Sequence, residues 1–178
     1  EETNRPFFPM AASFVPQVDK EMTTFTASIH KDNWSRFADI ALPMLTEPGF
    51  REDDFKRLKE AQLNALREDL RSNNEEELGK ERLQANLFAG TPYGHPVLGS
   101  TAGIQATTLD DVKEFWKKAY GRNNALIGIA GDAPPEVKGK VTEALQNLQG
   151  QSTLTDAGKP VARRPQGFEV EIVQKETR

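Results

Sequence analysis

The sequence predicts an α+β fold, in which an antiparallel or mixed sheet is covered on one face by helices. Residues 11–30 mix Thr and aromatic residues in rough alternation with polar ones, which is typical of two antiparallel strands joined by a tight turn. Most of the remaining chain carries apolar residues at the three- and four-residue spacing of amphipathic helices. Residues 123–132 and 167–176 have the apolar patterns of further strands. Few strands and many helices, with a hairpin first, favour the α+β class.

The hairpin and the helix that follows it are predicted from local signals. The turn is expected at residues 19–21, and Pro16 places its strand at a sheet edge or a bulge because proline lacks a backbone donor. Asp32 is the expected N-cap of a helix over residues 32–45, which Pro43 should kink or end. The inward face of this helix consists of Trp34, Phe37, Ile40 or Ala41, and Met44.

Two more helices are expected before residue 90. The first covers residues 51–71, and its apolar set comprises Phe55, Leu58, Leu63, Leu66 and Leu70, with Ala61 and Ala65. Ser72, Asn73 and Asn74 each stand three residues before a glutamate, which is the capping-box arrangement and predicts a new helix that runs to about Phe88. The acidic run at residues 75–77 fits capping better than metal binding, because acids in a first turn stabilise the positive end of the helix dipole.

The C-terminal half is predicted in the same way. Thr107 or Thr108 caps a helix over residues 109–120 that ends at Gly121. Its inward residues are Val112, Phe115, Trp116 and Tyr120. Residues 123–132 are expected to form a buried strand. Pro135 then opens a helix that ends at Gly150 and turns Val137, Val141, Leu145 and Leu148 toward the core.

Composition limits the possible functions. The chain has 178 residues and a net charge of −4, with 28% charged and 37% hydrophobic residues, the balance of a globular protein. Basic and acidic residues are interspersed, so no nucleic-acid partner is expected. No run of about 18 apolar residues occurs, so no membrane span is expected. The absence of cysteine excludes disulfides, thiolate metal sites and a cysteine nucleophile. Because His30 and His95 are the only histidines, a metal site within this chain would be rich in carboxylates.

Several motifs occur in an order that resembles one family. The loop "TPYGHPVLGS" is followed by "LDDVKEFWKKAYGRNN" and by the apolar stretch "ALIGIAGD". The loop positions that match the family are Pro92, Tyr93, Gly94 and Gly99. Further matches are Leu109, Asp111, Val112, Phe115, Tyr120 and Asn124 in the helix, and Gly131 and Asp132 at the strand end. This succession, over residues 10–174, resembles the pitrilysin/insulinase family of zinc peptidases and their non-catalytic relatives.

The resemblance implies a two-layer metallopeptidase-like domain of the pitrilysin type, with zinc in the full-length family member. The family motif H-x-x-E-H supplies two zinc ligands and the glutamate that activates water. The resemblance places this motif upstream of residue 1, so no cofactor is expected for this chain alone. It also aligns the histidine of the family loop with Thr91, and the loop is expected to shape the domain. His95, among Pro and Gly residues, and His30, at a strand end, are expected to be solvated or hydrogen-bonded residues.

The resemblance also implies that a glutamate on the helix over residues 51–71 is the last zinc ligand. Counting along the helix leads to Glu68 as the candidate metal ligand, and Glu60 and Asp69 fit less well. The family context "V-x-x-E" is replaced here by "AQLNALRED", and an acid on a helix is more often part of a solvated face. No catalytic or substrate-binding residue is assigned from the sequence.

The expected organisation is a pitrilysin-type α+β domain over residues 1–150, incomplete at its N-terminus, a linker over 151–166, and a strand over 167–178 that leads to a second similar half. The expected function is to contribute the scaffold of a peptide-binding chamber, with a peptide or protein substrate and a second similar domain or subunit as partners. Peptide-bond hydrolysis is expected only if the upstream zinc motif is present. The alternative is a binding or assembly module without enzymatic activity. Family habit favours a bacterial periplasm or cell envelope as the location.

Overall fold

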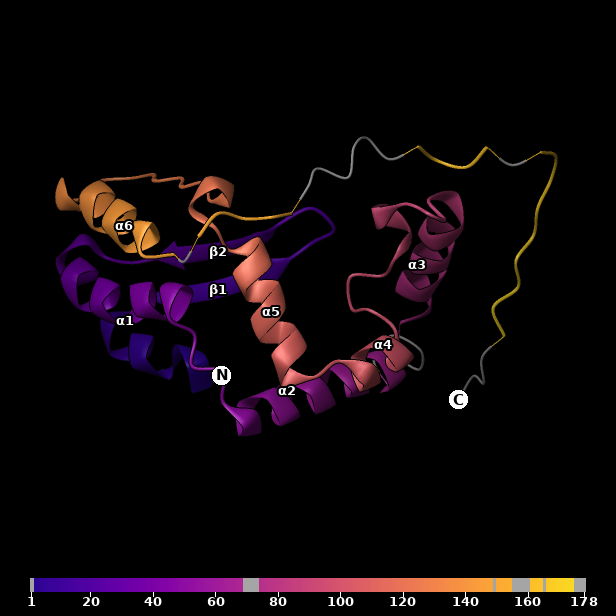
Figure 1. Cartoon of the computed structure of the whole chain (residues 1–178), viewed down its shortest axis with the longest axis horizontal. Coiled ribbons are helices and arrows are strands. Elements are labelled where there is room, and N and C mark those ends of the chain that lie inside the picture. The colour runs from indigo at the N-terminus through magenta and orange to yellow at the C-terminus, as the bar shows by residue number, and fades with distance from the viewer. Residues whose placement is uncertain (1, 69–73, 149, 155–160, 165, 175–178) are drawn as a thin grey trace. The chain divides into compact units, whose positions relative to one another are not determined.

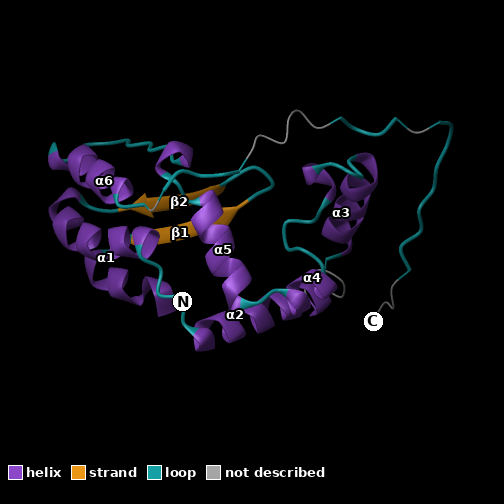
Figure 2. Cartoon of the chain, in the orientation of Figure 1, coloured by secondary structure: helices purple, strands orange, loops and turns teal. Residues whose placement is uncertain are grey.

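The computed structural model describes residues 2–68, 74–148, 150–154, 161–164 and 166–174. It is rich in helix and contains a single antiparallel pair of strands among these residues (Figures 1 and 2). The elements are η1 (Glu2–Met10), β1 (Ser13–Val18), β2 (Thr23–Ser28), η2 (Lys31–Asn33), α1 (Trp34–Thr46), α2 (Glu52–Asn64), α3 (Glu75–Leu87), η4 (Pro92–Gly94), α4 (Thr101–Ala106), α5 (Leu109–Ala119), η5 (Arg122–Asn124) and α6 (Glu136–Gln146). The α+β class predicted from the sequence is confirmed.

The chain divides into two compact units. Unit 1 comprises Glu1–Phe50 and Asp110–Leu154, and unit 2 comprises Arg51–Leu109 and Thr155–Arg178. Unit 1 contains the hairpin with α1 and α6 and nearly all of α5, whereas unit 2 contains α2, α3 and α4. The expected division into a domain over 1–150, a linker and a following strand stays a prediction.

The β1–β2 hairpin is built as the sequence predicts. The strands pair in the register Ser13↔Ser28 to Val18↔Thr23. Asp19 closes the turn, because one of its carboxylate oxygens accepts hydrogen bonds from the amides of Glu21 at 2.7 Å and Met22 at 2.8 Å. These two bonds hold the pKa of Asp19 below its ordinary value. On the sheet, the rings of Phe14 and Phe25 stack with their centroids 5.7 Å apart, a diagonal cross-strand pair.

The core of unit 1 is aromatic and lies between η1, the hairpin, α1 and α6. Its buried members are Phe7, Met10, Phe14, Trp34, Phe37, Ala38, Ala41 and Val137. Phe7 packs against Phe37 with their ring centroids 5.0 Å apart, and both rings contact Phe14. The sequence left open whether Ile40 or Ala41 faces the core. In the structure Ala41 is buried, and Ile40 is only partly buried. Burial of such rings is the largest source of stability that this unit offers.

The start of α1 differs from the expectation, and its end excludes one of the two effects expected of Pro43. Asp32 does not cap the helix: it lies inside η2, and Asn33 is the residue before Trp34. The Asn33 side chain instead donates to the Met10 carbonyl at 3.0 Å. Pro43 does not end the helix either, since α1 continues to Thr46 and the Glu47 amide bonds the Pro43 carbonyl at 2.8 Å. Because proline has no backbone N–H, Pro43 removes one backbone hydrogen bond from α1. The helix continues for three more residues in spite of this loss.

Helix α5 is less buried than predicted. Trp116 lies half-buried between Phe50 and Tyr120, with ring centroids at 5.8 and 6.3 Å. Tyr120 in turn contacts Phe25 of β2 with the centroids 6.5 Å apart. Phe115, expected to face inward, is 56% exposed. The expectation for Phe115 was wrong, because the aromatic contacts beside α5 are made by Trp116 and by Tyr120, which follows the helix.

Two expected strands are not formed. Residues 125–130 have no ladder partner among the described residues, and Leu126 is fully exposed. Residues 168–174 are likewise not paired in a sheet, and Phe168 is 93% exposed. Both predictions rested on the local apolar pattern alone. A strand also needs a neighbouring strand to bond its backbone, and no described segment pairs with either stretch. The end of the second expected strand, residues 175–176, lies outside the described residues.

In unit 2, polar contacts connect α2 to α4 and to the loop that precedes it. Lys59 of α2 donates to the carbonyls of Gln105 at 2.8 Å and Thr107 at 2.7 Å, at the end of α4. Gln62 of α2 donates to the Leu98 carbonyl at 2.9 Å. Helix α4 was not predicted, since six residues with a central Gly103 give no clear apolar period. Within the described part of the chain, no helix has the length and apolar character needed to cross a membrane.

Candidate functional site

The loop at residues 90–100 has a structural role. Thr91 begins η4: its hydroxyl donates to the Phe88 carbonyl at 2.8 Å and accepts from the Tyr93 amide at 3.2 Å. A side chain at Gly94 would bring its Cβ to 2.5 Å from the Phe88 carbonyl oxygen, so only glycine fits there. Ser100 then caps α4 by accepting from the Gly103 amide at 3.1 Å. The loop therefore turns the chain from α3 into α4.

The two histidines lie apart from any metal-binding cluster in the structure. His95 is exposed at the end of η4. His30 is also exposed, with its Nδ1 3.4 Å from the Asp32 amide and 3.5 Å from an Asp32 carboxylate oxygen. The described residues contain no group of three or more His, Cys, Asp or Glu side chains arranged to hold a metal ion.

Glu68, the candidate metal ligand, lies in a π-helical turn at residues 65–68 that continues α2, and its side chain is exposed. Glu60 is also exposed on α2, and Asp69 lies outside the described residues. A structural or catalytic zinc site takes at least three protein ligands, and the described residues do not assemble them. The assignment of Glu68 stays a prediction that depends on ligands from outside this chain.

The acidic run at residues 75–77 forms the first turn of α3, directly after the residue that caps the helix. The Asn74 side chain accepts from the Glu77 amide at 3.2 Å, which makes Asn74 the N-cap. Lys80 lies one turn on, with its Nζ 2.7 Å from a Glu76 carboxylate oxygen and 3.0 Å from one of Glu77. The hydrogen bonds that the Lys80 ammonium donates to these two carboxylates raise the pKa of Lys80. The capping interpretation is confirmed for these residues.

The outer edges of the β1–β2 hairpin are the feature best suited to bind a peptide. No strand among the described residues pairs with either edge, so the outward amides and carbonyls of β1 and β2 have no sheet partner there. An extended peptide adds to such an edge through main-chain hydrogen bonds. Pro16 removes one donor from β1, and Val15 and Val18 on that strand are 48% and 56% exposed. The turn at Asp19 and the stacked pair Phe14–Phe25 fix the hairpin rigidly.

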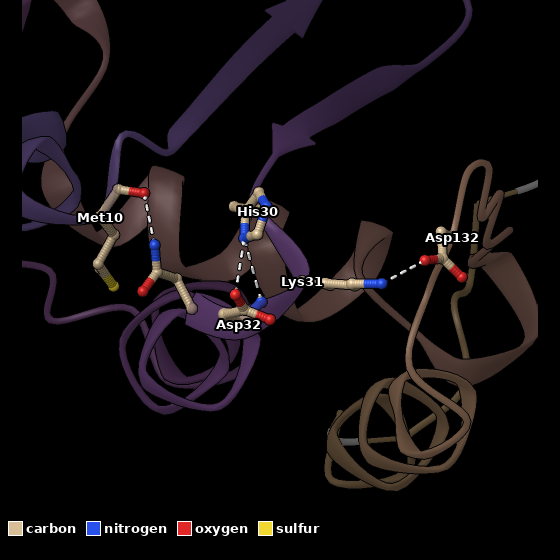
Figure 3. A network of polar contacts seen from close by, with 6 residues as sticks. Met10, His30, Lys31, Asp32 and Asp132 are labelled. Carbon is tan, nitrogen blue, oxygen red and sulfur yellow. Dashed lines mark hydrogen bonds and ion pairs between the residues drawn. The ribbon is translucent and has the colours of Figure 1, made fainter.

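An exposed ion pair joins η2, just after β2, to the segment before α6. Figure 3 shows Lys31 reaching Asp132, with the Lys31 Nζ 2.6 Å from a carboxylate oxygen of Asp132. Met10, His30 and Asp32 lie at the same end of α1. Sequence reasoning did not find this ion pair. The available signal was Asp132, which matched a family position without a role, but the sequence carries no sign that Lys31 would be its partner.

The chain is similar in sequence to peptidases and to a non-peptidase protein. It is 25% identical over 150 residues to a probable mitochondrial-processing peptidase subunit beta of Arabidopsis thaliana, covering 84% of this chain and 28% of that protein. It is 28% identical over 116 residues to the non-peptidase homolog YmxG of Helicobacter pylori, covering 65% of this chain and 25% of that protein. The chain thus spans about a quarter of the length of these relatives. No family model matches the sequence.

A solved structure shares the fold. The crystal structure of a peptidase M16 inactive domain from Pseudomonas fluorescens matches with a TM-score of 0.78 and 22% identity, covering 89% of this chain and 39% of that one. Such a match over most of the chain shows that the two proteins share a fold.

Proposed function

We propose that this chain, whose fold and sequence relatives are those of the pitrilysin/insulinase family of zinc peptidases and their non-peptidase homologues, is a scaffold that holds an extended peptide. The observation that carries the proposal is the unpaired edge of the β1–β2 hairpin on a fold of this type. The peptide is held by main-chain hydrogen bonds to that edge, so binding depends little on the peptide sequence.

Hydrolysis is proposed only for a longer protein that carries the upstream zinc motif. In such a protein the metal-bound water would be the nucleophile. The residues of this chain do not fit a zinc site of their own, because the described part holds no cluster of three ligands. Glu68 is the residue of this chain that we propose as a ligand there. The name of a relative as a beta subunit supports the proposal that the chain works beside a second similar domain or subunit.

The alternative is a binding or assembly module without chemistry. Two comparisons favour it: one relative is named a non-peptidase homolog, and the matching structure is an inactive domain. The two functions share the same peptide-binding edge and differ in the fate of the peptide. A bound peptide that stays intact in the longer protein, even with zinc supplied, supports the alternative.

The test of the scaffold function uses the full chain and a fluorescently labelled extended peptide. Binding is followed by fluorescence anisotropy, and amide hydrogen exchange locates the site. We expect slower exchange along an outer edge of β1 or β2 when the peptide is bound. The matched control is the same peptide with alternate backbone amides N-methylated, which cannot donate to a sheet edge and should not bind. Equal binding of both peptides would contradict strand addition.

The test of the zinc proposal uses the longer protein. If it carries H-x-x-E-H, metal analysis should find about one zinc per chain, and Glu68→Gln should reduce the zinc content. Glu60→Gln is the matched control, since Glu60 is an exposed acid on the same helix that fits the count less well. Retention of zinc in the Glu68→Gln protein would rule out Glu68 as a ligand.

A further inference from the structure

One face of helix α3 in unit 2 contacts the C-terminal segment of the chain. Gly79, Leu83 and Leu87 recur along this face at helical four-residue spacing, with Arg82 and Asn86 beside them. Leu83 is 61% exposed and, with Leu87 one turn on, forms an apolar strip on this face. The face therefore combines a guanidinium, an amide and an apolar strip along one side of α3.

The segment over residues 169–173 lies along this face through its acids. The carboxylate of Glu171 accepts hydrogen bonds from the Arg82 guanidinium and from the side-chain amide of Asn86. Glu169 pairs at 2.6 Å with Arg163, whose backbone amide donates to the Leu87 carbonyl at the end of α3. The Arg82 and Asn86 contacts hold the pKa of Glu171 below its ordinary value. The carboxylate of Glu171 is thus recognised by two donors on one helix turn.

Most apolar residues in and beside this segment remain largely exposed, although Val170 and Val173 line the groove against α3. Phe168, Val170 and Ile172 alternate with the acids and are 93%, 68% and 85% exposed. Between α3 and the segment there remains a groove of about 330 Å³. Apart from the neighbouring backbone of α3 itself, nothing lies within 4 Å of the place where a Cβ on Gly79 would stand, so this end of the groove is open. The segment is therefore held mainly by polar contacts at the surface, which are weak and sensitive to salt.

We propose that the α3 face formed by Arg82, Leu83, Asn86 and Leu87 is a docking site for extended peptide segments in which an acidic residue is followed two positions later by an apolar one, and that residues 169–173 occupy it as a built-in ligand. The recognition needs a carboxylate for Arg82 and Asn86 and an apolar side chain for the strip at Leu83. Any extended segment that carries these groups at the spacing of Glu171 and Val173 satisfies it. This inference is independent of the peptide-binding hairpin edge, which lies in unit 1.

The test exploits competition between the built-in ligand and the same segment added in trans. A labelled peptide with the sequence of residues 166–174, "QGFEVEIVQ", is titrated into the full chain and followed by fluorescence anisotropy. We expect the Glu171→Gln chain to bind it about three- to tenfold more tightly than the unchanged chain, because its own segment no longer competes well. Adding Arg82→Gln to that chain should abolish binding, as should replacing the second glutamate of the peptide by glutamine.

The control is the Glu76→Gln chain, which removes the same charge from an exposed position on α3 whose described partner is Lys80. This chain should bind the peptide no better than the unchanged chain. All three substituted residues are at the surface, and circular dichroism checks that the helices are kept. The proposal is overturned if the Glu171→Gln chain does not bind the peptide, or if binding survives the loss of Arg82.

Discussion

At the scale of single residues, Asp19 shows how one side chain sets the geometry of an element. Its carboxylate bonds the amides of Glu21 and Met22 and so closes the turn between β1 and β2. Replacing Asp19 by alanine removes both acceptors, and we expect amide exchange in the hairpin to become roughly two- to tenfold faster. Asp19→Asn keeps an acceptor oxygen and is the matched control. Exchange that is unchanged in the alanine variant would mean that the strands alone hold the turn.

The same residue predicts the direction of a pH effect. The pKa of Asp19 is lowered in the folded chain by the two amide hydrogen bonds. Its contribution to stability is therefore complete above the unfolded pKa, about 3.9, and is lost as the pH falls through the lower folded value. In that acidic window the protection factors of the hairpin amides, which divide out the intrinsic pH dependence of exchange, should fall in the unchanged chain and change less in Asp19→Ala. Equal acid sensitivity of both chains would contradict the role of Asp19.

Two glycines differ in whether a side chain would fit at their positions. Gly94 has no room for a side chain beside the Phe88 carbonyl, and we expect Gly94→Ala to lower the free energy of unfolding by about 1–3 kcal/mol. Gly79 lies inside α3 with open space around it, so Gly79→Ala should raise that free energy by up to about 1 kcal/mol. Urea unfolding followed by circular dichroism measures both. Similar effects of the two substitutions would show that the loop yields around Gly94.

At the scale of elements, helix α5 separates a packed aromatic side from an exposed one. Trp116 contacts Phe50 and Tyr120, so Trp116→Ala should cost about 1–3 kcal/mol, less than the full cost of emptying a core position. Phe115→Ala should cost about 0.5 kcal/mol or less, because Phe115 is 56% exposed. Urea unfolding of the two variants compares them directly. If Phe115→Ala lowered the free energy of unfolding by more than Trp116→Ala, Phe115 would be buried in solution, and its side of α5 would contact another surface.

The elements also show which predictions the sequence supports. The hairpin and the helices α1, α2, α3, α5 and α6 follow from signals within each segment, such as apolar spacing and caps. The unpaired segment over residues 125–130 and the exposure of Phe115 depend on neighbours that are distant in sequence, and no local pattern reports them. The contact of Glu171 with Arg82 and Asn86 has the same origin, since 89 positions separate Glu171 from Arg82. Glu68 was proposed from a family count, which states nothing about its surroundings.

At the scale of the whole molecule, the unpaired segment over residues 125–130 predicts a dependence on further polypeptide. Its backbone has no ladder partner among the described residues, and Leu126, Ile127 and Ile129 are exposed. We expect its amides to exchange within the first seconds in this chain and at least tenfold more slowly in a longer protein that supplies a neighbouring strand. The amides of β1, paired in both proteins, are the internal control. Equal exchange of residues 125–130 in both proteins would show that they are not a strand of the complete sheet.

Both tryptophans of the chain, Trp34 in the core and Trp116 beside Tyr120, belong to unit 1. Intrinsic tryptophan fluorescence therefore records the melting of unit 1 and is silent about unit 2. The helical signal in the far ultraviolet comes from both units. A chain in which the two optical signals change together unfolds as one cooperative body, and a chain in which they separate contains two bodies that melt independently.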